Sequence, residues 1–130
     1  EDIGNANPNA LVIANAAFEI SSNIGYPEAR IVLSQLAIYL ACSPKSNSAY
    51  LAINSALDAI AKGEILGVPD YLKDTNSAAK RQQRGKNYLY PHDFGGWVEQ
   101  EYLKKPLKFV SLNMIGFEKT LAEWLGKIRG

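Results

Sequence analysis

Residues 27–44 have the sequence PEARIVLSQLAIYLACSP, which predicts a helix with apolar residues on nearly every side. Its first two residues suit a helix start, because proline tolerates the first helical position and an acid is favoured by the positive end of the helix dipole. A helix that is apolar all round needs contacts on every side, so this one belongs to the core of the fold or to an interface between subunits. The candidate residues for that role are Ile31, Leu33, Leu36, Ile38, Tyr39 and Leu40.

A second helix is predicted on the N-terminal side of this one. Asn7 followed by Pro8 is a typical helix start, since the asparagine side chain can accept from free backbone N–H groups. Gly25 predicts its end, because glycine readily takes the left-handed conformation that follows a helix. The spacing of its apolar residues predicts one apolar face, with Leu11, Ala14, Ala17 and Phe18.

A third helix is predicted on the C-terminal side. Ser43 and Pro44 repeat the start signal, and Gly63 predicts the end. Three- and four-residue steps predict an inner face made by Tyr50, Ile53, Leu57 and Ile60.

The second half of the sequence contains fewer helical patterns. Residues 69–72 predict a single helical turn, and the aromatic, turn-rich residues 88–97 are expected to fold back onto the helical core. Residues 108–115 are the one extended stretch that the sequence suggests. A closing amphipathic helix is predicted from residue 117 onward, with Leu121, Trp124, Leu125 and Ile128 on one side.

These patterns predict an all-α fold in a single domain over residues 1–130. We expect a compact helical bundle of about three core helices in residues 1–63, followed by a loop-rich half in residues 64–130 that ends in the amphipathic helix. A chain of 130 residues with 47% hydrophobic and 21% charged residues has the composition of one globular domain. The first residue is Glu1 and the only methionine is Met114, so we expect a processed chain or a segment of a longer protein.

Charge and cysteine content exclude several classes of protein. The net charge of +1 favours no partner, although residues 1–60 carry five acids and two bases and residues 61–130 carry eight acids and twelve bases. One cysteine cannot form an internal disulfide, so a reducing, cytoplasmic compartment is expected. No apolar run approaches the roughly eighteen residues of a membrane span, so we expect no membrane partner.

The sequence contains no set of residues typical of an enzyme. There is no glycine-rich phosphate loop, and one histidine with one cysteine cannot supply the four ligands of a zinc site, so neither cofactor nor metal is expected in this chain. Cys42 ends an apolar helix and is interpreted as a small core residue rather than a nucleophile. His92 and Asp93 are the one pair that could perform acid–base chemistry, but a structural role in a tight turn is the simpler interpretation.

A basic cluster suggests contact with nucleic acid. The candidate DNA-contact residues are Lys80, Arg81, Arg84 and Lys86. If all four met single-strand phosphates, log affinity against log salt would have a slope near about −3. Tyr88 and Tyr90 follow closely and could stack on bases. A solvated surface loop is the alternative interpretation of the same charges.

Three blocks of sequence, taken in order, resemble a known family. They are EDIGNANPNAL at 1–11, PEAR at 27–30 with AIYLACSPKSNSAY at 37–50, and GKNYLYPHD at 85–93 with GWV at 96–98. Together they span nearly the whole chain and are similar to the C-terminal region of the replication-associated recombination protein A family. That family, also called MgsA, consists of AAA+ ATPases related to the eukaryotic Werner helicase-interacting protein.

The resemblance implies several properties. The parent protein would carry an N-terminal ATPase module that binds ATP and Mg²⁺, while this region would be helical and similar to the collar domains of clamp loaders. It implies a homotetramer as the assembly, DNA as a partner of the full-length protein, a single-stranded DNA-binding protein as a further partner, and a cytoplasmic, nucleoid-associated location.

Three functions remain open at this point. The first is an oligomerisation module that buries apolar helix surface between identical subunits, with a tetramer favoured over a dimer. The second is a DNA-contact module that uses the basic loop at 80–86. The third is an independent hydrolase built on His92 and Asp93.

Overall fold

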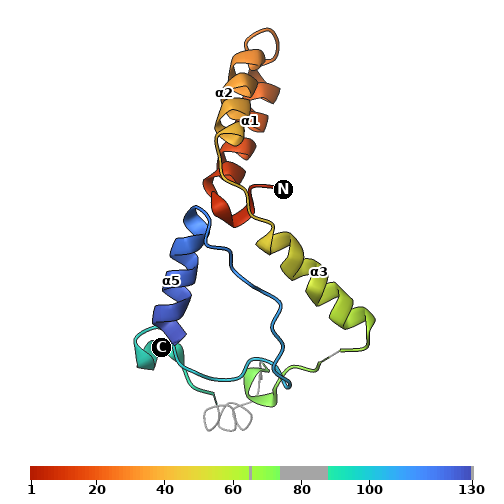
Figure 1. Cartoon of the computed structure of the whole chain (residues 1–130), viewed down its shortest axis with the longest axis vertical. Helices are drawn as coiled ribbons and strands as arrows, with labels where there is room; N and C mark the ends of the chain where they lie inside the picture. Colours follow the sequence, from red (N-terminus) through yellow and green to blue (C-terminus); the bar gives the residue numbers. More distant parts are fainter. Residues whose placement is uncertain (65, 74–87, 130) are drawn as a thin grey trace. The chain divides into compact units, whose positions relative to one another are not determined.

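The computed structural model describes residues 1–64, 66–73 and 88–129. Within this part of the chain the fold is all-α, as the sequence predicts, and no strand occurs there. The elements are η1 (Gly4–Ala6), α1 (Asn9–Ile24), α2 (Ala29–Ala41), α3 (Ser48–Ala61), η2 (Asp70–Leu72), η3 (Pro91–Phe94) and α5 (Phe117–Arg129), where η denotes a 3₁₀ helix (Figure 1).

The chain divides into two compact units. Unit 1 comprises Glu1–Ala56 and Phe109–Lys127, so it contains α1, α2, the first part of α3 and nearly all of α5. Unit 2 comprises Leu57–Lys108 and the last residues from Ile128 onward. Residues 109–127 therefore fold with the N-terminal helices, although they come from the other end of the sequence.

Helices α1 and α2 lie side by side as an antiparallel hairpin (Figure 1). Gly25 ends α1 with a φ of 69°, a conformation that glycine adopts without a steric penalty. Ala10 and Ala17, which are buried, lie two turns apart and so face the same way along α1. Ala29 is buried on α2. Small side chains thus occupy the buried positions of the hairpin, and we use the name hairpin for α1 and α2 throughout.

The starts of two helices, α1 and α3, differ from the sequence predictions. The Asn7 side chain does not cap α1, because it bonds to Tyr39 and Ser43 instead. Helix α3 begins at Ser48 rather than at Pro44, since the preceding residues are held in a loop by the Ser46 N–H, which donates to the backbone oxygens of Asp2 and Ile3. The predicted ends at Gly25 and Gly63 hold to within two residues.

Several residues predicted to be internal are exposed. The predicted inner face of α3 lies in solvent, with Tyr50, Ile53, Leu57 and Ile60 all more than half exposed. Cys42 is likewise exposed just after α2, so the prediction that it is a core residue is wrong. Within the hairpin the fully buried apolar residues are alanines, and many of the larger apolar side chains are exposed.

In residues 64–130, the helical segments occur where the sequence predicts them. The single turn predicted at 69–72 is η2, and the closing helix is α5, whose Phe117 and Trp124 rings meet edge to face at 5.7 Å. Residues 108–113 have no regular secondary structure and residues 114–115 form a bend, so the extended conformation of 108–115 stays a prediction. No described helix is both long enough and apolar enough to cross a membrane.

Candidate self-association surface

A polar cluster joins the two helices of the hairpin at the end near the N-terminus. The Asn7 Nδ2 donates to the Tyr39 hydroxyl at 3.0 Å and to Ser43 Oγ at 3.1 Å, and the Tyr39 hydroxyl donates back to Asn7 Oδ1. Asn9 also donates to the Tyr39 hydroxyl, and the Ser43 hydroxyl donates to the Tyr39 carbonyl. These bonds fix α2 and the loop after it against the start of α1.

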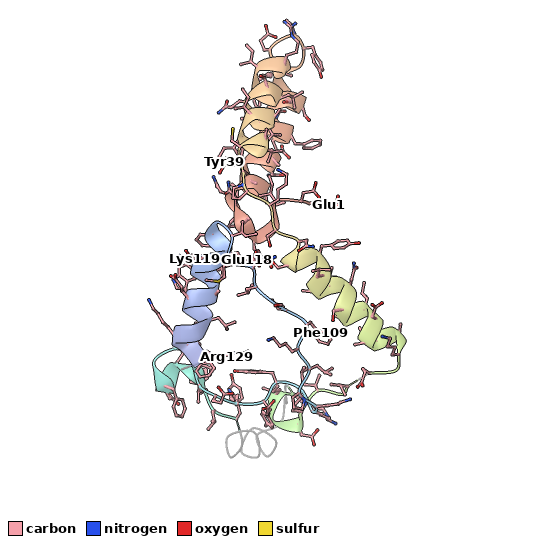
Figure 2. All side chains as sticks on the ribbon, viewed as in Figure 1. Glu1, Tyr39, Phe109, Glu118, Lys119 and Arg129 are labelled. Carbon is pink, nitrogen blue, oxygen red and sulfur yellow. The ribbon has the colours of Figure 1, made fainter. Side chains whose placement is uncertain are left out.

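A second polar cluster surrounds Glu118, which has no exposed surface (Figure 2). Ser46 Oγ accepts from Asn113 Nδ2 at 2.9 Å and from the Ser48 N–H at 3.3 Å. Ser48 Oγ accepts from Asn5 Nδ2 at 3.4 Å. Both serine hydroxyl protons therefore remain for the Glu118 carboxylate. We call these five residues the polar hub.

The environment of Glu118 favours its charged form. Burial acts to raise the pKa of this carboxyl, but the hydroxyls of Ser46 and Ser48 and the backbone N–H of Asn113 outweigh burial and hold the pKa below its usual value. Among the described residues no donor meets the carboxylate oxygens at full hydrogen-bond geometry, so these contacts act mainly through their electrostatic field. Glu118 also lies in the first turn of α5 and beside the first residue of α3, where helix dipoles favour a negative charge.

Two glycines allow the backbone to approach closely around the polar hub. Gly4 has a φ of 51°, and a Cβ there would lie 2.7 Å from the Ser46 carbonyl oxygen. Gly116 has a φ of 55°, and a Cβ there would collide with the Ala6 carbonyl oxygen and come within 3.0 Å of Pro44 Cγ. The N-terminal residues, the loop before α3 and the start of α5 are thus held together by backbone contacts that a side chain would prevent.

The hairpin presents large apolar side chains to solvent on both of its helices. On α1, Leu11 is 80% exposed and Phe18 is 68% exposed; on α2, Ile31 is 72% exposed and Ile38 is 63% exposed. Figure 2 shows side chains projecting outward along the length of both helices. We call this surface the hairpin surface; its large exposed apolar residues are Leu11, Val12, Phe18, Ile20, Ile24, Tyr26, Ile31, Leu33 and Ile38.

The structure separates the predicted core-or-interface residues of α2 into two groups. Ile31, Leu33 and Ile38 are exposed and belong to the hairpin surface. The other three, Leu36, Tyr39 and Leu40, are partly buried, and Tyr39 takes part in the polar cluster with Asn7. None of the six is fully buried within one chain.

The other predicted site residues lie in unit 2 or outside the described residues. Lys80, Arg81, Arg84 and Lys86 lie outside the described residues. His92 and Asp93 lie in η3 and are exposed; the Asp93 N–H donates to the Tyr90 carbonyl at 3.0 Å. A structural role for His92 and Asp93 in a turn stays a prediction.

A cavity of about 650 Å³ opens in unit 1 beside the polar hub. Most of its lining residues have polar or charged side chains; the lining consists of Glu1, Asp2, Lys45, Ser46, Asn47, Tyr50, Asn113 and Ile115. No group of three or more potential metal ligands occurs within the described ranges. The cavity therefore presents hydrogen-bonding side chains, and its described residues do not form a metal-binding cluster.

The sequence interpretation missed the polar hub. Asn5, Ser46, Ser48 and Asn113 are residue types that usually mark turns and helix caps, and Glu118 occupies an ordinary position for an acid at a helix start. Their convergence depends on contacts between residues far apart in the sequence, such as that of Asn113 with Ser46, 67 positions away. The density of Asn and Ser in residues 5–9 and 43–48 is the signal that could have indicated it.

Comparison with known proteins identifies relatives along almost the whole chain. Replication-associated recombination protein A of Bacillus subtilis is 49% identical over 110 residues, covering 83% of this chain and 26% of that protein. The protein of the same name from Escherichia coli K12 is 36% identical over 94 residues, covering 72% of this chain and 21% of that protein. ATPase WRNIP1 of Dictyostelium discoideum is 35% identical over 111 residues, covering 83% of this chain and 13% of that protein.

This chain thus spans about a quarter or less of the length of these relatives. The profile described as "MgsA AAA+ ATPase C terminal" matches residues 1–129. The match includes the hairpin, the polar hub and η3, so the resemblance of the three sequence blocks is confirmed. The chain belongs to the MgsA AAA+ ATPase C-terminal family.

Proposed function

We propose that this chain is the oligomerisation module of an AAA+ ATPase that acts in replication-fork maintenance and recombination, and that it holds identical subunits in a homotetramer. The observation that carries the proposal is the hairpin surface, where side chains as large as Leu11, Phe18 and Ile31 are more than two-thirds exposed. Contiguous apolar surface beyond a few hundred Å² is uncommon on soluble monomers and marks interaction sites.

The amount of apolar surface is sufficient for stable assembly. The nine large side chains of the hairpin surface expose on the order of 1,000 Å² per chain. Leu11 and Ile20, nine residues apart, lie on opposite sides of α1, so this area would be divided between more than one interface, as in a tetramer. Complete burial of each side chain contributes about 1.5–3 kcal/mol, so several of them together offset the roughly 4–15 kcal/mol that association costs.

The composition of the hairpin favours a second copy of the same chain as the occupant. Residues 9–41 contain only Glu19, Glu28 and Arg30 as charged residues. A surface with so little charge offers no electrostatic complementarity to a charged partner, but it can pack against an identical apolar surface. The alanine contacts inside the hairpin and the polar cluster at Asn7 keep that surface rigid before assembly, which lowers the entropy lost on association.

The names of the relatives and the family membership support the wider role that we propose. A C-terminal module of an AAA+ ATPase has no need of its own nucleotide site, so ATP hydrolysis with Mg²⁺ belongs to another module of the parent protein. In that arrangement the chain would keep several ATPase modules together at DNA in the cytoplasm, near the nucleoid. A single-stranded DNA-binding protein is a further proposed partner of the parent protein.

The molar mass of this chain in solution tests the assembly. Light scattering at micromolar concentration is expected to give about 57 kDa, four times the 14.3 kDa of one chain. Phe18→Glu and Ile31→Glu place charges in the hairpin surface and are expected to reduce the mass toward that of one chain. Far-UV circular dichroism must show that both variants retain their helices.

Val68→Glu is the matched control, because Val68 is 54% exposed but lies in a loop outside the hairpin. Its mass is expected to equal that of the unsubstituted chain. A dimer in place of a tetramer would revise the stoichiometry. A monomer of the unsubstituted chain at micromolar concentration would refute the proposal.

A further inference from the structure

The cavity of about 650 Å³ in unit 1 has more acidic than basic side chains in its lining. Glu1 and Asp2 each supply a carboxylate, and Lys45 supplies the one basic side chain among the lining residues. The Lys45 ammonium donates to the Ser43 carbonyl at 3.5 Å. No ion pair within the described part of the chain occupies either carboxylate. Both carboxylates are therefore available to a cationic ligand.

A third negative charge lies behind the cavity, in the polar hub. Ser46 and Asn113 line the cavity and also belong to the hub around Glu118. The lowered pKa of Glu118 keeps its carboxylate charged at neutral pH, and no cationic side chain pairs with it among the described residues. Because a buried charge is weakly screened by water, it adds to the negative potential in the cavity.

The rest of the lining suits a planar cation on an aliphatic stem. Asn113 donates through Nδ2 to Ser46 Oγ at 2.9 Å, so its Oδ1 is the side-chain acceptor left for a ligand. Asn47 supplies a second amide, and Tyr50, which is 56% exposed, supplies an aromatic ring. A guanidinium carries several N–H donors in one plane and stacks on aromatic rings, whereas an ammonium is compact and more strongly hydrated. Ile115 offers apolar contact to the stem.

An anion and a metal ion suit this cavity less well. An anion would meet two carboxylates for each ammonium in the lining and the buried charge of Glu118 behind it. A metal ion needs several ligand atoms at bonding distance, and the described residues contain no group of three or more acidic, histidine or cysteine ligands. A cavity of about 650 Å³ is also much larger than a single ion.

We propose that this cavity binds a guanidinium group. Its N–H groups donate to the Glu1 and Asp2 carboxylates and to Asn113 Oδ1, and its plane stacks on the Tyr50 ring. An arginine side chain of a peptide and a free small molecule are the two sources of such a group. The inference does not rest on the proposed assembly, because no residue of the cavity lining belongs to the hairpin surface.

An NMR titration of the isotope-labelled chain with acetyl-arginine amide tests the cavity. A Kd on the order of 1 mM is expected for so small a ligand, with the largest shifts at the Asn47 and Asn113 side-chain amides. Acetyl-citrulline amide has nearly the same shape but a neutral urea, and it is expected to bind about tenfold more weakly. Acetyl-lysine amide, with a free side-chain ammonium, is expected to bind more weakly than the arginine compound.

Two substitutions in the lining test the contacts. Asp2→Asn is expected to raise the Kd by about fivefold, because one of the accepting carboxylates loses its charge. Glu19→Gln is the matched control: it removes an equal charge from an exposed position on α1 in the same unit, and it is expected to leave the Kd unchanged. Tyr50→Ala is expected to raise the Kd by about fivefold, whereas Tyr50→Phe keeps the ring and is expected to bind as the unsubstituted chain does.

Butylguanidine keeps the guanidinium and the stem but lacks the amides of a peptide, so it distinguishes the two sources. Tighter binding of acetyl-arginine amide would support a peptide, and equal or tighter binding of butylguanidine would support a free small molecule. Equal affinity for the citrulline compound, equal or tighter binding of the lysine compound, or a Kd that neither Asp2→Asn nor Tyr50→Ala changes would refute the proposal. Phe18→Glu is expected to bind as the unsubstituted chain does, so failure of assembly and failure of this site are separate results.

Discussion

Glu118 is a carboxylate without exposed surface in a chain whose large apolar side chains are mostly in solvent. Burial of a charge is tolerated when polar groups and helix dipoles stabilise it in place. Here Ser46, Ser48 and Asn113 provide that stabilisation. The buried apolar residues are one isoleucine and several alanines, which pack with little directional preference. At the residue scale, the polar contacts around Glu118 therefore determine how the segments of unit 1 are positioned.

Substitution Glu118→Gln tests the polar hub. It removes the charge while keeping the shape, and it is expected to lower the free energy of unfolding by about 1–3 kcal/mol because a neutral amide, with a donor NH₂ in place of one oxygen, replaces the buried negative charge that the surrounding dipoles favour. Glu123→Gln, an exposed change in the same helix, is expected to alter it by less than about 0.5 kcal/mol. Urea unfolding measures both, and equal stabilities would contradict this role of Glu118.

The same substitution predicts a change in acid sensitivity. The folded-state pKa of Glu118 lies below the usual value of 4.5, so the unfolded chain binds the proton more tightly than the folded chain does. The stabilisation is complete above that value and is lost as the pH falls through the folded-state pKa. The difference in unfolding free energy between the unsubstituted chain and Glu118→Gln is therefore expected to shrink below pH 4.5. A difference that is constant with pH would count against a charged Glu118.

At the scale of elements, α5 has a glycine in crowded surroundings just before its first residue and a second glycine in uncrowded surroundings near its end. Gly116 precedes the helix with a positive φ and lies against the Ala6 carbonyl, whereas Gly126 lies within the helix and a Cβ there would meet no atom of the described residues within 4 Å. The two glycines differ in their surroundings although they are ten residues apart in the same segment. They therefore provide a matched pair of substitutions.

Gly116→Ala is expected to lower the free energy of unfolding by at least about 2 kcal/mol, because a Cβ collides with backbone and the positive φ is unfavourable. Gly126→Ala is expected to raise it by about 0.5–1 kcal/mol, because alanine is the better helix former. Urea unfolding of the two variants checks both signs. A stabilising Gly116→Ala would show that α5 does not begin against the N-terminal residues.

The helices also show how far local patterns predict structure. The glycine that ends α1, the turn at η2 and the extent of α5 follow from neighbouring residues, so the sequence predicted them closely. The start of α3 was predicted four residues early because Ser43 and Pro44 form a good local start signal. The Ser46 N–H is instead bound to the N-terminal residues, and such a long-range bond leaves no periodic pattern in the sequence.

At the scale of the whole molecule, the assembly proposal makes the stability of the chain depend on its concentration. If folded chains associate through the hairpin surface, assembly stabilises the folded state by mass action. The Tm is expected to rise by about 3 °C for each tenfold increase in protein concentration. Phe18→Glu is expected to remove this dependence, and differential scanning calorimetry measures it. A Tm independent of concentration for the unsubstituted chain would contradict assembly at those concentrations.

The sequence by itself determined the helical class, most helix boundaries and the family, because each depends on local spacing or on ordered blocks of residues. It could not determine which faces of those helices are buried, since a protein core and a subunit interface use the same apolar residue types. Only the tertiary structure decided that alanines make the contacts within the hairpin, that Phe18 and Ile31 remain outside, and that Glu118 lies inside. The physical reason is that burial depends on which distant segments meet, and the meeting of Asn5, Ser46, Asn113 and Glu118 is a property of the folded chain alone.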